Sequence, residues 1–425
     1  MKNKVILLMS TIFCVLMCLS TVAQNTADYV RVNQLFNFDW KFKLGEFSDA
    51  QSPSFDDSNW RKLDLPHDFQ IEQPWDQTAN KGRGFKTLGV GWYRKTFKAD
   101  NAWKGKQVVL DFEGIMLHGE VWVNGKKIGG TSYGYLGFEA DIADLIKYEE
   151  LNVVSVRCST EGGSRWYTGG GLFRDLHLVV KDKVSIARHG VFITTPTISD
   201  QKAEVSVQVE VAGIKNQEYN LEINTKLYSP EGKQVAETKT MAPKKSKLTE
   251  VEVLLPKVII ANPQLWSCET PNLYSAEVVL VLNGKVIDKV TKKFGIRTIE
   301  FSKEFGFKLN GKKVFLKGVA NHHDLGAVGA AAHKTSIARM MDQLKAFGFN
   351  HIRTSHNPYS ESFFELADEK GILVVDELYD KWGSIQAWAG GAPWNDIWYN
   401  NMKEWIKRDR NHPSVIMWSL DRKSV

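Results

Sequence analysis

Polar side chains gather after three predicted strands in the last third of the chain. The strands are followed by Asn321-His322-His323-Asp324, by Arg353-Thr354-Ser355-His356-Asn357 and by Asp376-Glu377. Imidazole, guanidinium and carboxyl groups bind polar substrates and transfer protons. In parallel α/β barrels, residues at the carboxyl ends of strands face the active-site mouth. One such strand end would be unremarkable in a structural repeat, but three in succession indicate a functional site.

The elements that position these residues alternate between short apolar strands and amphipathic helices from about residue 308 onward. We expect strands at 315–317, 351–353, 373–375 and 415–418, and helices at 336–347, 360–370 and 394–409. Repeated β-α units with buried strands are typical of a parallel sheet. A (β/α)8 barrel closes with eight strands, whereas this segment offers about four, so the pattern predicts an incomplete TIM barrel.

Two all-β units precede this segment. The first contains Val121-Trp122-Val123-Asn124-Gly125-Lys126-Lys127-Ile128, in which Asn-Gly between apolar alternations signals a tight hairpin. The second alternates strictly over 203–211, has another Asn-Gly hairpin at 283–284, and has the length of a small immunoglobulin-like sandwich. In the first unit the run 164–171, Ser-Arg-Trp-Tyr-Thr-Gly-Gly-Gly, is typical of a functional loop because polar residues and glycines follow a strand end.

The amino terminus is typical of a secretory signal peptide. A positive start at Lys2 and Lys4, an apolar stretch at 5–19 and small residues at 21–23 predict a signal over 1–23. We therefore expect a secreted protein, periplasmic or extracellular, without membrane insertion after signal cleavage. Two of the four cysteines lie within the signal, and the other two, Cys158 and Cys268, are far apart, so a disulfide framework is not supported.

Composition is that of a soluble globular protein, with 43% hydrophobic and 24% charged residues among 425. The formal net charge is +6, and loss of Lys2 and Lys4 with the signal leaves 6 − 2 = +4. This charge is distributed without a basic block. Neither nucleic-acid binding nor membrane binding follows from it.

Several motifs together resemble glycoside hydrolase family 2, which contains β-galactosidases, β-glucuronidases and β-mannosidases. They are Trp92-Tyr93-Arg94, Gly171-Leu172-Phe173-Arg174-Asp175, the strand-end residues above and the segment 411–420. The resemblance implies a jelly-roll sugar-binding-like domain over 24–181, an immunoglobulin-like β-sandwich over 182–297 and the amino-terminal half of a TIM-barrel catalytic domain over 298–425. The runs 317–326 and 352–358 resemble the β-galactosidase branch. The resemblance therefore implies retaining hydrolysis of terminal non-reducing β-D-galactose from an oligo- or polysaccharide.

The resemblance also implies roles for individual residues. It implies that the subsite for the non-reducing sugar is lined by His322, Arg353 and His356, with Asn357 nearby, Asp376 and Glu377 at the third strand end, and Ser164 and Arg165 reaching in from the first domain. An alternative for Arg353 is a bidentate pair with a pocket carboxylate instead of a sugar contact. Some β-galactosidases use a Glu-x-His pair after the Asp-Glu to bind a metal. Here 378–383 reads Leu-Tyr-Asp-Lys-Trp-Gly, so we expect no metal and no cofactor.

The sequence differs from the family pattern at the position of the catalytic acid/base. The family places this glutamate in a Gly-Asn-Glu or similar run directly after Trp-Ser-Leu, and here that position is Lys423. Because a cation opposes the oxocarbenium-like transition state, we expect no catalysis by the chain as given. For one choice of codons, a single inserted base after Leu420 gives Leu-Gly-Ser-Glu-Ile-Gly and restores the glutamate. A frameshift, a natural truncation and a mis-called gene all stay open.

Two alternative functions stay open as well. One is a β-glucuronidase of the same family, and the other is a non-catalytic carbohydrate-binding protein. An oligomer is compatible with the sequence.

Overall fold

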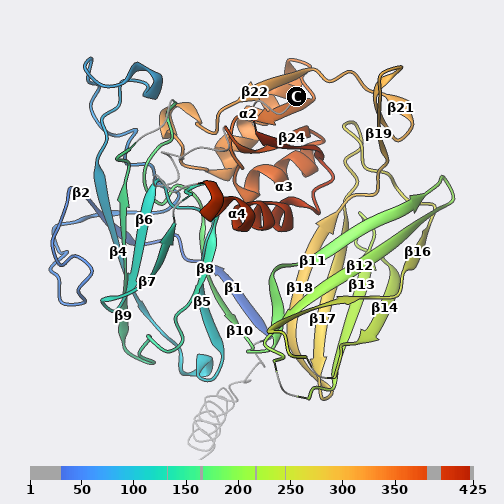
Figure 1. The fold of residues 1–425 in the computed structure, drawn as a ribbon, viewed down its shortest axis with the longest axis horizontal. Coiled ribbons are helices and arrows are strands. Elements are labelled where there is room, and N and C mark those ends of the chain that lie inside the picture. The colour runs from blue at the N-terminus through green and yellow to red at the C-terminus, as the bar shows by residue number, and fades with distance from the viewer. Residues whose placement is uncertain are drawn as a thin grey trace, which may run out of the picture.

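The computed structural model describes residues 30–131, 133–162, 166–215, 218–244, 246–380 and 394–421. Two β-sandwiches stand side by side, and an α/β unit lies above and between them (Figure 1). The predicted signal peptide, 1–23, lies outside the described residues. The predicted fold class is confirmed in this order along the chain: a jelly-roll sandwich, an immunoglobulin-like sandwich and part of a TIM barrel.

The jelly roll consists of two antiparallel sheets that enclose an apolar core. The larger sheet has the order β3 (Arg61–Leu63), β2 (Trp40–Leu44), β4 (Val90–Lys98), β9 (Leu151–Ser159), β6 (His118–Val123), β7 (Lys126–Thr131). The smaller has the order β1 (Arg31–Leu35), β10 (Leu176–Lys181), β5 (Gln107–Phe112), β8 (Phe138–Asp141). The predicted β6–β7 hairpin is confirmed, and Asn124 and Gly125 have φ of 50° and 83° in its turn, as a type I′ turn requires.

The immunoglobulin-like sandwich packs a sheet of long strands against a second sheet. One sheet contains β11 (Ser185–Ile198), β12 (Lys202–Ala212), β15 (Glu250–Leu254) and, also paired with β12, β16 (Val258–Ala261). The other has the order β14 (Gln234–Met241), β13 (Leu221–Tyr228), β17 (Tyr274–Leu282), β18 (Lys285–Phe294). Alternate residues of β13 are buried, as expected for a strand with one face on a core.

The α/β unit follows a small antiparallel sheet of β19 (Ile299–Ser302), β20 (Gly306–Leu309) and β21 (Lys312–Lys313). Its parallel sheet has the order β22 (Gly318–Asn321), β23 (His351–Thr354), β24 (Leu373–Tyr379), β25 (Val415–Asp421). The helices are α2 (Lys334–Ala346), α3 (Glu361–Lys370) and α4 (Trp394–Asp409). Short 3₁₀ helices lie in loops of the chain: η1 (Lys81–Arg83), η2 (Asn101–Trp103) and η3 (Gly326–Val328).

The prediction for the first barrel strand was wrong by three residues. The apolar pair Phe315 and Leu316 suggested a strand at 315–317, but Phe315 is 76% exposed and the strand is Gly318–Asn321. The four described strands of this sheet otherwise follow the predicted β-α order. Because the sheet is parallel and in register, the carboxyl ends of β22, β23 and β24 lie next to one another.

The immunoglobulin-like unit is fixed to the barrel by buried polar contacts. The indole Nε1 of Trp266 donates to the Asp368 carbonyl of α3 at 2.9 Å, and Arg297 donates to the Val415 carbonyl of β25 at 2.6 Å. Burial lowers the pKa of Arg297 to about 10. This unit therefore supports the base of the parallel sheet.

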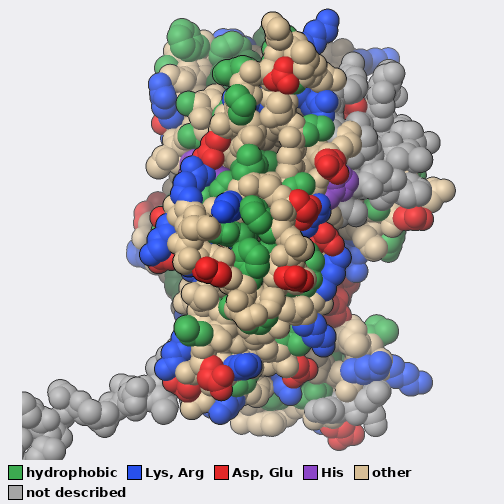
Figure 2. Space-filling view, turned by 90° about the vertical axis from the view of Figure 1, so that its left-hand side faces the viewer, with side chains coloured by type: hydrophobic (Ala, Val, Ile, Leu, Met, Phe, Trp, Pro, Cys, Tyr) green, Lys and Arg blue, Asp and Glu red, His purple; other side chains and the backbone are tan. Residues whose placement is uncertain are grey.

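Charge on the outer face of the jelly roll is mixed. Lys and Arg side chains lie among Asp and Glu on the face drawn in Figure 2, which gives no continuous basic stripe among the side chains described there. None of the described helices is long and apolar enough to cross a membrane.

Candidate functional site

Glu377 is the centre of the candidate site. Its side chain is fully buried at the end of β24, and Arg353 of β23 donates to its Oε2 from Nε at 2.7 Å and from Nη2 at 2.6 Å. His356, in the loop after β23, contacts Oε1 through Nδ1 at 2.9 Å. Both carboxylate oxygens are thus occupied, and these bonds to a buried carboxylate fix the geometry of both partners.

Strand register explains why these side chains meet. Arg353 pairs with Val375 in the parallel ladder, and Glu377 follows two residues later on the same face of β24. The Arg353 side chain keeps 32% of its surface exposed, while Glu377 keeps none. The carboxylate therefore lies beneath the guanidinium, on the side of the sheet that forms the interior of a barrel.

Aromatic rings complete the wall next to this pair. The rings of His322 and His356 are perpendicular with centroids 5.7 Å apart, and the Trp166 ring lies 5.3 Å from His322 and 5.9 Å from His356. Trp166 comes from the jelly roll, where its Nε1 contacts the Tyr135 hydroxyl at 3.3 Å. Burial, and then the nearby His356, lower the pKa of His322, so its ring is neutral near pH 7.

Asp376 does not lie with the other predicted site residues. It is on the opposite face of β24, fully buried, where Trp405 of α4 donates from Nε1 to Oδ2 at 2.5 Å. Thr354 Oγ1 lies 3.3 Å from its other oxygen. Burial, and then the charge of Asp409, raise the pKa of Asp376 well above its usual range. The expectation that it contacts substrate is corrected, because alternation along a strand sends consecutive side chains to opposite faces.

Asn357 is also withdrawn from the predicted subsite. It has no exposed surface, and its Nδ2 donates to the Pro358 carbonyl at 3.1 Å. The structure therefore brings together His322, Arg353, His356 and Glu377, and places Asn357 and Asp376 behind them. The predicted residues Ser164, Arg165 and Lys423 lie outside the described residues.

His323, which is not among the predicted site residues, joins the jelly roll to the barrel. His323 is buried, and its Nε2 donates to the Thr168 carbonyl at 3.0 Å. Burial lowers its pKa to about 3. The residue was visible beside His322 after the first strand, but nothing in the sequence distinguished a ring that binds backbone from one that lines a pocket.

Asp68 is a second bridge that the sequence did not indicate. Its carboxylate accepts from the Tyr167 hydroxyl at 2.5 Å, from the Gly170 amide at 2.8 Å and from the Ala330 amide of the barrel at 2.8 Å. Burial raises its pKa. It anchors the Trp166 loop to the barrel, which is how a jelly-roll residue reaches the strand ends.

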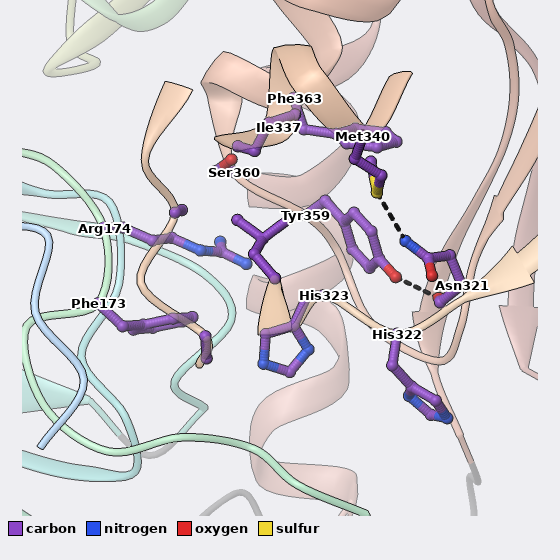
Figure 3. A pocket seen from close by; sticks show the side chains of 13 residues that line it. Phe173, Arg174, Asn321, His322, His323, Ile337, Met340, Tyr359, Ser360 and Phe363 are labelled. Atoms are coloured by element: carbon purple, nitrogen blue, oxygen red, sulfur yellow. Dashed lines mark hydrogen bonds between the residues drawn. The ribbon is translucent and has the colours of Figure 1, made fainter. Parts of the chain in front are cut away.

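Arg174 is a third bridge. Its Nη1 donates to the Tyr135 carbonyl at 2.7 Å and its Nη2 to the Pro358 carbonyl at 2.8 Å, from a buried position. It also borders a small cavity that His322 and His323 line as well, and at its edge the Tyr359 hydroxyl donates to the Asn321 carbonyl (Figure 3). The cavity volume of ≈ 20 Å³ suits about one water molecule. A sugar ring does not fit there, so the candidate site is the open wall and not this cavity.

The chemistry of the wall is that of binding. Arg353 and His356 are held by a buried carboxylate, and because His356 Nδ1 faces that carboxylate, Nε2 is the ring atom left to face a ligand. A hydroxyl group both accepts and donates hydrogen bonds, so hydroxyl-rich molecules suit the Arg353 guanidinium and His356 Nε2. Glu377 is saturated by its partners and Asp376 faces away, so neither is placed to protonate or attack a ligand at this wall.

In the part of the strand ends that the structure describes, metal ligands do not converge. Among the described residues, the group whose carboxylate and imidazole atoms come close enough to share a metal ion is Glu113, Asp175 and His177 of the jelly roll.

Comparison with known proteins gives matches along most of the chain. Models of one family match three consecutive stretches: glycosyl hydrolases family 2, sugar binding domain, over 37–181; glycosyl hydrolases family 2 over 184–297; and glycosyl hydrolases family 2, TIM barrel domain, over 301–425.

The relatives that match the chain include proteins named β-galactosidase and proteins named β-glucuronidase. The chain is 36% identical over 390 residues to β-galactosidase BoGH2A of Bacteroides ovatus, covering 91% of this chain and 46% of that protein. It is 29% identical over 414 residues to a β-glucuronidase of Bacteroides fragilis, covering 92% of this chain and 56% of that protein. A crystal structure of a glycosyl hydrolase family 2 member from Bacteroides cellulosilyticus superposes with a TM-score of 0.87 at 37% identity, covering 91% and 51% of the two chains. The chain spans about half the length of the curated relatives it matches.

Proposed function

Since the chain belongs to glycoside hydrolase family 2, we propose that it supplies the wall that holds the terminal non-reducing sugar of a β-glycosidase substrate, with β-D-galactose as that sugar. The observation that carries this proposal is the Arg353–Glu377–His356 arrangement at the carboxyl ends of parallel strands, next to His322 and Trp166. Ligands of α/β barrels bind at this end of the sheet. The substrate is an oligo- or polysaccharide.

The contacts match the chemistry of a sugar. A pyranose presents hydroxyl oxygens that accept hydrogen bonds and a weakly polar ring face that packs on aromatic rings. Arg353 supplies donors and His356 Nε2 supplies a further hydrogen-bonding atom, Glu377 fixes the orientation of both side chains, and Trp166 supplies a flat ring. Fixed donors lose little conformational freedom on binding, which favours recognition of one hydroxyl arrangement over another.

Hydrolysis needs more than this wall. A retaining β-glycosidase uses two carboxyl groups about 5 Å apart, one as acid/base and one as nucleophile. Glu377 is occupied on both oxygens and Asp376 lies on the far face of β24. We therefore propose that the 425-residue polypeptide binds the sugar but does not cleave it.

β-Glucuronidase is the second candidate, because relatives with that name match the chain over a similar extent. A glucuronide carries a carboxylate that galactose lacks, and a buried cation–carboxylate pair discriminates against an added anion unless another cation is present. Arg353 is already paired with Glu377, which favours the neutral sugar at this wall.

The test combines hydrolysis and binding by the purified protein. The proposal expects no release of nitrophenol from the chromogenic β-D-galactoside or β-D-glucuronide, and expects saturation-transfer NMR signals for methyl β-D-galactoside that exceed those for methyl β-D-glucuronide. The variant His356→Ala should lose these signals, while His118→Ala, a histidine of the jelly-roll sheet, should keep them. Release of nitrophenol refutes the lack of cleavage, and equal signals in His356→Ala refute the sugar wall. A stronger signal for the glucuronide favours the second candidate.

Export is a separate proposal. We propose that residues 1–23 are removed on secretion, and amino-terminal sequencing of the protein recovered from outside the cytoplasm should begin at Gln24. An amino terminus at Met1 in that fraction would refute it.

A further inference from the structure

A group of metal-binding side chains lies in the jelly roll, away from the sugar wall. Asp175 and His177 are two residues apart, so they share a face at the start of β10. Leu176 pairs with Phe112, and the Glu113 amide donates to the Asp175 carbonyl at 3.1 Å, which places Glu113 opposite Asp175. Ligand atoms of Glu113, Asp175 and His177 all lie within 4.8 Å of one another.

Two carboxylates in directly opposite positions repel each other and need compensation. Asp175 has one neutral donor, the Asn37 amide at 2.7 Å, and the neighbouring Asp111 is paired with Arg188 at 2.9 Å. The Glu113 side chain is only 10% exposed, and its partner is His177, whose Nε2 lies 3.7 Å from Oε1. At this distance the contact is longer than a direct hydrogen bond, so it compensates the two carboxylates only in part.

The orientation of His177 is that of a metal ligand. Its Nδ1 lies 3.0 Å from the Asn33 side-chain oxygen, which can only accept, so Nδ1 carries the hydrogen. Nε2 is the ring atom that faces Glu113, and it becomes available to a metal ion once it has lost its proton. Histidines that bind metals are typically held in this way, with the other ring nitrogen donating to an oxygen.

The group borders a cavity that an ion can enter from solvent. The cavity has a volume of ≈ 690 Å³ and is lined by residues of all three units, among them Glu113 of the jelly roll, Lys289 of the immunoglobulin-like sandwich and Glu361 of α3. Lys334, which also borders it, is bonded to Glu365 at 2.7 Å and so is not the counter-ion of Glu113.

We propose that Glu113, Asp175 and His177 bind a divalent transition-metal ion, with Zn²⁺ as the preferred metal. Two carboxylate oxygens and one imidazole nitrogen suit Zn²⁺ better than Ca²⁺ or Mg²⁺, which prefer oxygen ligands. Zn²⁺ ligands lie about 2.0–2.2 Å from the ion, hence at most about 4.4 Å apart, so small side-chain rotations close the present spacing. The ion would tie β5 to β10 where the three units meet. This proposed site is an exception to the sequence-based expectation of no metal, because that expectation rests on residues 378–383 alone.

The test measures metal binding by the whole chain, purified with a histidine-free affinity tag and stripped with chelator. Calorimetry with ZnCl₂ should give one site per chain, and Ca²⁺ and Mg²⁺ should bind at least 10-fold more weakly. The variants Glu113→Gln and His177→Asn should each weaken Zn²⁺ binding at least 10-fold. Glu72→Gln is the matched control, since Glu72 pairs with His67 at 3.2 Å in the same domain but without a third ligand.

A second readout uses the unaltered protein, in case the variants do not fold. Diethyl pyrocarbonate should modify His177 in the metal-free protein, and Zn²⁺ should protect it while leaving the modification of His118 unchanged, as measured by mass spectrometry of peptides. Absence of Zn²⁺ binding, equal affinity in Glu113→Gln, tighter binding of Ca²⁺ or Mg²⁺, or equal modification of His177 with and without Zn²⁺ would each overturn the proposal. None of these outcomes bears on the sugar wall, so the two proposals fail separately.

Discussion

Asp376 and Glu377 are consecutive in the chain, yet their carboxylates lie on opposite faces of β24 and have different partners. Glu377 is bound by Arg353 and His356 on the barrel-interior side, whereas Asp376 is bound by Trp405 on the helix side. One residue positions Arg353 and His356 of the sugar wall, and the other anchors α4.

The Arg353–Glu377 pair should be strongly coupled in stability. Arg353→Ala leaves the buried Glu377 carboxylate with only His356 as a partner. We expect the free energy of unfolding to fall by about 2–4 kcal/mol, which is less than for a fully buried ion pair because the Arg353 side chain is 32% exposed. The double variant with Glu377→Gln should lose less than the sum of the single losses, as urea unfolding would measure. Additive losses would show that the two side chains do not interact.

Asp376 should tolerate replacement by its neutral isostere. Because its pKa is raised in the folded protein, folding takes up a proton and the wild type loses stability as pH rises above the unfolded value near 4. Asp376→Asn is uncharged at every pH, so the stability of the variant relative to wild type should increase from pH 4 to pH 8. Asp409→Asn is the control: it leaves Arg408 without its partner and should destabilise. A relative stability of Asp376→Asn that falls with pH contradicts the assignment.

His323 should make the protein sensitive to acid. Its pKa of about 3 in the folded state lies below the unfolded value near 6.5, so the unfolded chain binds a proton that the folded chain does not. Stability is therefore lost as pH falls from about 6.5 to about 3, with a slope approaching about 1.4 kcal/mol per pH unit from this residue. His323→Gln, which keeps a donor for the Thr168 carbonyl, should flatten the slope in chemical denaturation. An unchanged slope would mean that the ring protonates without cost.

Trp166 should matter for binding more than an exposed tryptophan of the same domain. Trp166 is 8% exposed and contacts His322 and His356, whereas Trp75 is 71% exposed. Trp166→Leu should weaken methyl β-D-galactoside binding at least several-fold, since stacking on a sugar is worth on the order of 1 kcal/mol. Trp75→Leu should leave it unchanged in the same NMR titration. Equal effects of the two substitutions would argue against a jelly-roll contribution to the wall.

The sequence predicted the architecture better than the site. Hairpin turns such as Asn124-Gly125 and the β-α alternation around Arg353 depend on local periodicity, which one sequence displays. The site depends on which face a strand residue occupies. A shift of one position separates Glu377 from Asp376, and the first barrel strand was placed three residues early.

Contacts between domains could not be predicted from the sequence. Asp68 lies far from Ala330 in the chain, and no motif marks either residue, yet the bond between them brings Trp166 to the strand ends. Arg353 had two predicted roles, a sugar contact and a pair with a pocket carboxylate. In the structure Arg353 pairs with one oxygen of Glu377. Part of its guanidinium stays exposed, so it can also contact a sugar.

The most direct measurement is a crystal structure of the 425-residue protein soaked with methyl β-D-galactoside. The account predicts sugar density against the Trp166 ring, with hydroxyl groups within hydrogen-bond distance of Arg353 and His356 and with Glu377 still bound beneath them. A sugar bound elsewhere, with His322, Arg353 and His356 sharing no ligand, would contradict it.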